Sequence, residues 1–491
     1  MREYVPVTPE ITKRATQSVP NINTTYKRRY LGRAARYCGV ALAVSLSIGG
    51  MDAQSTSDGF VPFDQFLART AEAAAPAGSL DMSRPELASQ LAARPGLSNP
   101  ASFGQMRQHI LDMYQGVQVK HSYYLGLQIY DCVPIDQQPA VRIHGGGIAS
   151  APPDTAQDRP DGKVAAVKQF PRASASDAFG NAIGCEQQTI PMRRITLEDM
   201  TRYKSLDDFF SKGPNGAGRA PAAHTGGAGP APPTPIGHEH AYTRQQVNNL
   251  GANSKLNLWS PPVYTFLNEQ FNLSQIWVLG YGGGTLQSVE AGWQNDPQHY
   301  GSQNATLFVY STRDNYKPGV LWLTNGCYNL ECGTFVQVDN SWHLGGPIVT
   351  STDGGDQHEL PIRVLLYAGN WWVAVNGTWI GYYPGWFYTG GQLSRNATDV
   401  EFGGETASQS SDGSAAFYAP MGSGAWANAG FRHAAYQRDI YYTDTSNQGQ
   451  WATLSAATEC GGYSISTPAW GGPDWGVYFF FGGPGGICTS K

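Results

Sequence analysis

The stretch Ile362-Arg-Val-Leu-Leu-Tyr-Ala-Gly-Asn-Trp-Trp-Val-Ala-Val-Asn-Gly-Thr-Trp-Ile-Gly-Tyr382 decides the fold class. Its segments Ile362–Ala368, Trp371–Val375 and Thr378–Tyr382 are rich in β-branched and aromatic residues, as strands are. Asn376-Gly377 separates the last two segments and is a dipeptide preferred in two-residue hairpin turns. This pattern therefore predicts an antiparallel hairpin.

Similar short strand patterns recur from residue 237 onward, and no long helical pattern interrupts them. The chain has 59 Gly, 13 Trp and 26 Tyr, and only 14% of its residues are charged. We expect a mainly β fold, with an antiparallel β-sandwich in this part. The net charge of −5 comes with no basic face, which argues against a nucleic-acid partner.

A break in composition divides the chain, because every tryptophan lies after residue 258. Before the break, Phe103 to Gly116 has helical periodicity, and Thr196 is a good N-cap for a helix from about 197 to 210. With strand-like residues from Tyr123 to Tyr130, these segments predict a small α+β domain. The expected organisation is an export signal at 1–53, a weakly structured segment at 54–104, the α+β domain at 105–211, an exposed Gly/Pro linker at 212–236 and the β-sandwich at 237–491.

The N-terminus predicts export. Basic residues from Lys27 to Arg36 precede an apolar run from Cys38 to Gly50, which is too short to span a bilayer, and a cut is expected near Ala53. Arg28-Arg29-Tyr30-Leu31 resembles a twin-arginine signal, and a Sec-type signal is the alternative. We therefore expect a secreted or periplasmic protein, with no membrane association after signal removal.

Six cysteines remain outside the signal, which fits an oxidising compartment. Six cysteines allow 15 connectivities, and the composition break groups one pair in front and four cysteines behind. No cysteine spacing suggests zinc, and His238-Glu239-His240 is not the metal-binding H-E-x-x-H pattern. No metal and no cofactor are expected.

Carboxylates are the strongest catalytic candidates, since the chain has no G-x-S-x-G nucleophile motif. Glu290 begins Glu290-Ala-Gly-Trp293 and Glu405 ends Phe402-Gly-Gly-Glu405, both in apolar, aromatic surroundings that disfavour a charge. Two such carboxyl groups facing one another could share a proton and act as an acid/base pair. Surface turns are the alternative interpretation, and Glu401 and Glu331 are competing candidates.

From about residue 105 to its end, the chain resembles the neprosin family of secreted glutamic peptidases, which have a propeptide and a β-sandwich catalytic domain. The motifs that carry the resemblance are Gly184-Cys185, Thr189 to Asp199, Gly237 to Ala241, Gln275 to Leu279, Val289 to Gln294, Gly326 to Cys332, Phe335 to Gln337, Phe402 to Glu405 and Met421 to Gly424.

The resemblance implies that Glu290 and Glu405 are the catalytic pair, and that the enzyme cleaves on the carboxyl side of proline. It also implies the disulfides Cys132–Cys185, Cys327–Cys332 and Cys460–Cys488. We expect activity to peak in acid, where the pair holds one proton. Candidate substrate-binding residues are Trp293, Gln294, Gly403 and Gly404, because two glycines beside a carboxylate let a substrate backbone approach closely.

The expected partners are proline-containing peptides and the chain's own propeptide, as an intramolecular inhibitor. Six prolines in the linker suggest that the enzyme cuts itself there, between about residues 215 and 240. A glycan-binding sandwich without catalysis is the main rival, although a lectin does not need a propeptide-like front domain. A glycoside hydrolase and an inactive family member are less favoured, because both glutamate motifs are intact and match a peptidase family.

Overall fold

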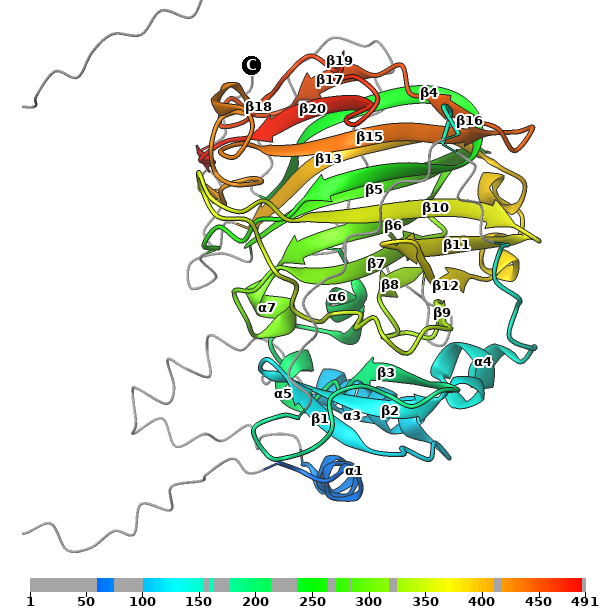
Figure 1. Ribbon diagram of the computed structural model, residues 1–491. Helices are drawn as coiled ribbons and strands as arrows, with labels where there is room; N and C mark the ends of the chain where they lie inside the picture. The colour runs from blue at the N-terminus through cyan, green and yellow to red at the C-terminus, as the bar shows by residue number, and fades with distance from the viewer. Residues whose placement is uncertain are drawn as a thin grey trace, which may run out of the picture. The chain divides into compact units, whose positions relative to one another are not determined.

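The computed structural model describes residues 60–74, 100–153, 159–162, 176–212, 236–263, 270–282, 284–317, 325–409 and 417–487. These residues all lie in the compact unit Phe60–Lys491. The expected export signal at 1–53, most of the segment 54–104, and linker residues 213–235 lie outside the described residues. The fold is mainly β, as expected, and its largest element is a curled antiparallel sheet that is sandwich-like (Figure 1).

The front part of the described chain is a small α+β unit. Its three-stranded antiparallel sheet has the order β1-β2-β3. The bounds are α1 Phe63–Glu72, α3 Pro100–Tyr114, β1 Ser122–Leu125, β2 Gln128–Pro134, η2 Ile135–Gln137, α4 Pro139–His144, β3 Thr189–Arg193, α5 Leu197–Met200 and α6 Leu206–Phe210.

Local signals placed these helices well, with one difference. Helix α3 confirms the helix expected near Phe103–Gly116. Thr196 caps α5 in a capping box with Asp199, as its sequence indicated. The single helix expected from 197 to 210 is instead two short helices, because Ser205 caps a second helix, α6, through the backbone N–H of Asp208.

Among the described residues, the large sheet contains sixteen strands, in the main order β8-β7-β6-β5-β13-β4-β10-β11-β12-β9. Its bounds, with the helices between, are β4 Ile236–Asn257, β5 Gln270–Gly282, β6 Thr285–Asn295, α7 Pro297–Tyr300, β7 Thr306–Thr312, β8 Gly326–Tyr328, β9 Val336–Gln337, β10 Glu359–Tyr367, β11 Asn370–Val375, β12 Thr378–Tyr383, η4 Gly385–Tyr388, η5 Gln392–Ser394, β13 Ala397–Gln409, η6 Ala427–Ala429, β15 Ala435–Asp444, β16 Gly449–Trp451, β17 Ser455–Thr458, β18 Ser464–Ile465, β19 Ala469–Trp470 and β20 Val477–Gly482. Strands β14 Phe417–Tyr418 and β21 Gly486–Ile487 form a separate pair.

Strand β4 connects the two parts of the curled sheet. Its first half pairs with β13 on one edge and with β17 on the other. Its second half pairs with β10 and β15. A strand of 22 residues can exchange partners in this way because the sheet twists along its length. Figure 1 shows the paired strands β13 and β5 running side by side.

The hairpin predicted at Asn376-Gly377 is confirmed. Strands β11 and β12 are antiparallel neighbours, with Val375 paired to Thr378 across the turn. Both turn residues have positive φ, 49° at Asn376 and 81° at Gly377. Two successive positive φ angles are the requirement of a type I′ turn, which explains this dipeptide.

Two of the implied disulfides form, Cys132–Cys185 and Cys327–Cys332. The first joins β2 to the segment before β3, and the second closes a turn after β8. Cys488 lies outside the described residues, so the Cys460–Cys488 pairing stays a prediction.

Gly292 in the first glutamate motif is required by packing. A Cβ at this position would lie 2.0 Å from the carbonyl oxygen of Ser274 on the neighbouring strand. At Gly104, in α3, a Cβ would meet no atom within 4 Å. We predict that Gly292→Ala lowers the free energy of unfolding by about 1–3 kcal/mol or more.

The matched control Gly104→Ala should raise the free energy of unfolding by about 0.5–1 kcal/mol, because alanine is the better helix former. Urea denaturation of the two variants tests the comparison. Equal stabilities would contradict the packing role of Gly292.

Candidate active site

The two sequence motifs meet on one face of the sheet, around strand β5. Glu290 on β6 pairs with Trp277 on β5, and Trp277 pairs with Glu401 on β13. Glu405 pairs with Leu273, two residues from Gln275. Because directly paired residues and every second residue share a face, Glu290, Gln275 and Glu405 point to the same side.

A lysine joins the two predicted catalytic glutamates. The Nζ atom of Lys212, just after α6, lies 2.6 Å from Oε2 of Glu290 and 2.6 Å from Oε2 of Glu405. All three side chains are buried, with at most 1% exposure. The sequence placed Lys212 in an exposed linker, and that expectation is wrong for this residue.

Gln275 also contacts both glutamates. Its Nε2 donates to Oε2 of Glu290 at 3.0 Å and lies 3.3 Å from Oε2 of Glu405. Its Oε1 is buried without a hydrogen-bond partner among the described residues. Gln275 is therefore a neutral donor placed between the two carboxyl groups.

The outer oxygens of the two glutamates have different partners. Oε1 of Glu290 accepts from the hydroxyls of Ser288 at 2.7 Å and Tyr316 at 2.6 Å. Oε1 of Glu405 is in short contact with Nδ1 of His238 and lies 3.6 Å from Nε2 of His240. The outer oxygen of Glu290 thus contacts neutral hydroxyls, whereas the outer oxygen of Glu405 faces two imidazoles.

The charges of this cluster depend on one another. Burial alone would raise the pKa of Glu405, but the charge of Lys212, the hydrogen bond with His238 and the nearby imidazole of His240 hold it well below its usual value. Burial would lower the pKa of Lys212, and the charges of Glu290 and Glu405 raise it instead. The site therefore contains a charged ammonium between acidic groups, a stable arrangement only while all of them stay together.

The four candidate substrate-binding residues occupy different environments. Gln294 shares the face of Glu290 and donates to Asp296 at 3.0 Å. Trp293 points to the opposite face, into the core, where its Nε1 donates to the carbonyl of Asn257 at 3.0 Å.

The two glycines of the second motif are tightly packed. A Cβ on Gly403 would lie 2.3 Å from the carbonyl oxygen of Ala241, and one on Gly404 would lie 2.4 Å from the ring of Phe481. Close packing between protein segments therefore accounts for both glycines. A substrate contact by any of the four residues stays a prediction.

The competing candidate Glu401 lies on the same face but not beside Lys212. Trp277 lies between Glu401 and Glu290 in the strand register. Oε1 of Glu401 is 3.2 Å from Nε of Arg244. Burial, followed by the charge of Asp399, raises the pKa of Glu401 well above its usual value. Glu401 is therefore a buried carboxyl that favours the neutral form.

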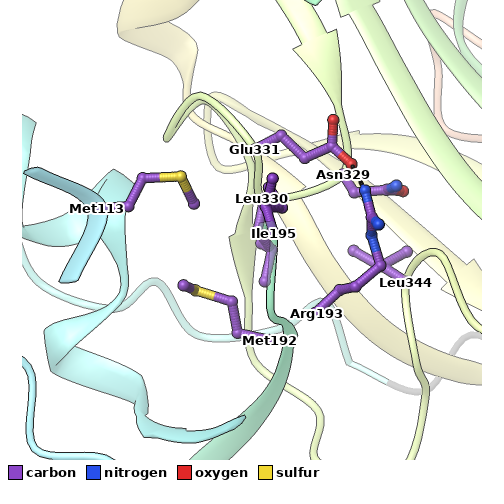
Figure 2. A pocket seen from close by; sticks show the side chains of 8 residues that line it. All are labelled: Met113, Met192, Arg193, Ile195, Asn329, Leu330, Glu331 and Leu344. Carbon is purple, nitrogen blue, oxygen red and sulfur yellow. Dashed lines mark hydrogen bonds and ion pairs between the residues drawn. The ribbon is translucent and has the colours of Figure 1, made fainter. Parts of the chain in front are cut away.

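Glu331, the other competitor, belongs to the contact between the front unit and the large sheet. It lies 3.0 Å from Arg193 of β3 and 2.9 Å from His299 of α7. Beside it is a cavity of about 10 Å³, at the lower limit for one water molecule. Figure 2 shows Glu331 and Arg193 on one side of this pocket and Met113 and Met192 on the other. Glu331 thus has a structural ion pair away from Glu290 and Glu405.

Sequence reasoning missed Lys212, Gln275, Tyr316 and the two histidines as site residues. Gln275 and His238-Glu239-His240 lie in motifs that the resemblance singled out, and those motifs were the available signal. Lys212 and Tyr316 carried no signal, because their positions depend on long-range folding.

The described ranges contain no group of three or more His, Cys, Asp or Glu side chains arranged to hold a metal ion. Among the helices described, none is long and apolar enough to cross a membrane.

Comparison with known proteins identifies the class of domain. Residues 268–484 match the model of the Neprosin family. This part of the chain, which carries both Glu290 and Glu405, matches the family that the motifs indicated. At the level of the family, the match supports a peptidase of the neprosin type.

Among solved structures, one similarity is to CG-16, a homodimeric agglutinin from chicken liver, at 12% identity and a TM-score of 0.18. The alignment covers 34% of this chain and 95% of the agglutinin. Similarity this low carries no argument about function.

Proposed function

We propose that this protein is a secreted glutamic endopeptidase that uses Glu290 and Glu405 as an acid/base pair. It cleaves on the carboxyl side of proline at acidic pH, and it is made as a zymogen that processes itself. The main support is the meeting of two distant motifs at one point, where both carboxyl groups bind the same buried ammonium. A buried carboxyl group with a strongly perturbed pKa, such as that of Glu405, is typical of a catalytic site.

The proposed reaction uses one ionised and one protonated glutamate. The ionised glutamate takes a proton from water, whose oxygen bonds to the scissile carbonyl carbon. The protonated glutamate gives its proton to the departing amine as the C–N bond breaks, which yields a carboxylic acid and an amine. The Nε2 of Gln275, beside both carboxyl groups, is suited to donate to the tetrahedral oxyanion.

We predict that Glu290→Gln and Glu405→Gln each reduce peptidase activity at least about 1000-fold, because each removes one half of the proton transfer. Glu401→Gln is the matched control. Glu401 is buried on the same sheet face and favours its neutral form. The activity of Glu401→Gln should stay within a few fold of the wild-type activity. Cleavage of a reporter peptide by the acid-incubated protein measures all three, and near-normal activity in both single mutants would overturn the assignment.

The proline preference rests on the neprosin resemblance and on the aromatic surroundings of the pair. Nζ of Lys212 lies 5.4 Å from the ring centroid of Trp277 and 6.0 Å from that of Tyr310. Such rings offer apolar walls for a side chain that has a fixed φ and no N–H. A proline-containing peptide library, read by mass spectrometry from about pH 3 to 7, tests this specificity. An absence of cleavage at every pH would favour a glycan-binding sandwich instead.

The zymogen proposal rests on the position of Lys212. Its ammonium occupies the space between the two carboxyl groups, where a water and a scissile carbonyl would have to lie. With Lys212 docked, the pKa of Glu405 is held well below its usual value. Without it, two adjacent carboxyl groups would share one proton. Release of Lys212 therefore takes up a proton, so falling pH favours release.

Two histidines where the front unit contacts the large sheet also favour release of the front unit as pH falls. His343, 2.7 Å from the hydroxyl of Tyr123 in β1, has its pKa lowered by burial to about 4. His109 of α3 lies 2.7 Å from the carbonyl oxygen of Glu331, and burial also lowers its pKa. Both are neutral when buried and regain a pKa near 6.5 when exposed. The contact should therefore weaken as pH falls below about 6.5.

We predict that Lys212→Met makes the unprocessed protein active at higher pH than the wild type, because the cation that blocks the pair is gone. Lys204→Met, an exposed lysine in the same segment, is the control and should behave as the wild type. Activity of the full-length chain from pH 4 to 7, measured before any cleavage, tests this. Identical profiles for the two variants would contradict the blocking role.

We also predict that acid incubation removes the front unit by cleavage within the proline-rich linker. N-terminal sequencing of the product should place the new terminus between about residues 215 and 240. In Glu290→Gln the full-length chain should persist under the same conditions. A stable, fully active full-length wild type would contradict self-processing.

A further inference from the structure

The two glutamates of the proposed site have unequal electrostatic surroundings. Glu290 accepts hydrogen bonds from two neutral hydroxyls, those of Ser288 and Tyr316. Glu405 lies against His238 and His240 of β4 instead. A hydroxyl can form a hydrogen bond with either the protonated or the ionised form of a carboxyl group, whereas a nearby cation stabilises the ionised form.

A third carboxylate keeps His240 charged. Nδ1 of His240 lies 2.6 Å from Oε2 of Glu459, while its Nε2 faces Oε1 of Glu405 at 3.6 Å. The imidazole thus stands between two carboxylates. Burial would lower the pKa of His240, but the charge of Glu459 and its contacts with Glu405 and Glu459 raise it to about 10. His240 therefore stays protonated through the acidic and neutral range.

Several ionisable groups lie around Glu405. From the described elements packed around it, they are Lys212 after α6, His238 and His240 on β4, Glu290 on β6, and the phenols Tyr310 and Tyr316, with Glu459 and Glu239 acting on His240. When Lys212 leaves, the histidines remain, since both are on the strand hydrogen-bonded to β13. The asymmetry between the two glutamates therefore survives release of the front unit.

Building on the proposed peptidase function, we infer that Glu405 is the general base, that Glu290 carries the catalytic proton, and that His240, held by Glu459, is the positioning residue that keeps Glu405 ionised. Glu405 takes the proton of the attacking water, and Glu290 delivers its own proton to the leaving amine. His240 exchanges no proton in this cycle and touches no reacting atom.

The assignment predicts which arm of the pH–activity profile each variant moves. The acidic arm reports ionisation of the base, and the alkaline arm reports loss of the proton from the acid. His240→Asn removes the cation beside Glu405, so the acidic arm should shift upward by about 1–3 pH units. Tyr316→Phe removes a hydrogen bond that stabilises ionised Glu290, so the alkaline arm should shift upward instead.

The full-length protein, activated in acid, is assayed with a proline-containing reporter peptide across pH 2 to 8. His240→Gln is made beside His240→Asn, so that a folding defect in one variant does not decide the result. Movement of the acidic arm in the histidine variants and of the alkaline arm in Tyr316→Phe supports the assignment. Movement of the alkaline arm in the histidine variants and of the acidic arm in Tyr316→Phe would make Glu290 the base. A pH–activity profile that does not move in the histidine variants would show that His240 does not position Glu405. Either result overturns the inference.

A second measurement does not depend on activity. The ring carbon shifts of His240 in the full-length protein are followed by NMR as pH is raised. We expect His240 to remain protonated above pH 7 and Glu459→Gln to lower its titration toward pH 6.5. Titration of the wild-type ring near 6.5 would overturn the inference even if the protein cleaves peptides. An absence of cleavage, with His240 charged as expected, would reject the peptidase proposal while leaving the ion pair in place.

Discussion

Two carboxyl groups buried side by side, with one ammonium between them, are the constraint on which the rest of this structure depends. Glu290 and Glu405 could not both stay ionised in a dry sheet face without a compensating charge. Lys212 supplies that charge from outside the sheet, at the end of α6. The front unit is therefore held to the sheet by electrostatics at the site as well as by apolar packing.

The need to compensate these buried charges also explains the polar side chains on the face of the sheet that carries Glu290 and Glu405. Strands β4, β13, β5 and β6 each contribute a polar side chain to the cluster, and each of these side chains contacts another on a neighbouring strand. His240 and Gln275 are examples, since one contacts Glu405 from β4 and the other reaches both glutamates from β5. The opposite face of these strands, with Trp293 on β6 and Ile276 on β5, belongs to the main apolar core.

Features set by a few neighbouring residues were predictable from the sequence, and features set by register were not. The Asn376-Gly377 turn and the Thr196 capping box follow from local chemistry, and both are confirmed. The pairing of Glu290 with Glu405, the proposed catalytic pair, was predicted only through the resemblance, because no local rule places Glu290 near Glu405. Lys212 was misplaced because its neighbours on one side are linker-like, whereas its own position is decided by contacts with strands far along the chain.

The pairing of β4 also restricts where the chain can be divided without loss of the site. Ile236 is already paired with Gln409, and His238 and His240 follow within the same strand. A new terminus beyond Gly237 would detach one or both imidazoles from Glu405. Pro235 is the last proline before this boundary. The pairing of β4 with β13 therefore limits the proposed maturation cleavage to peptide bonds before Gly237.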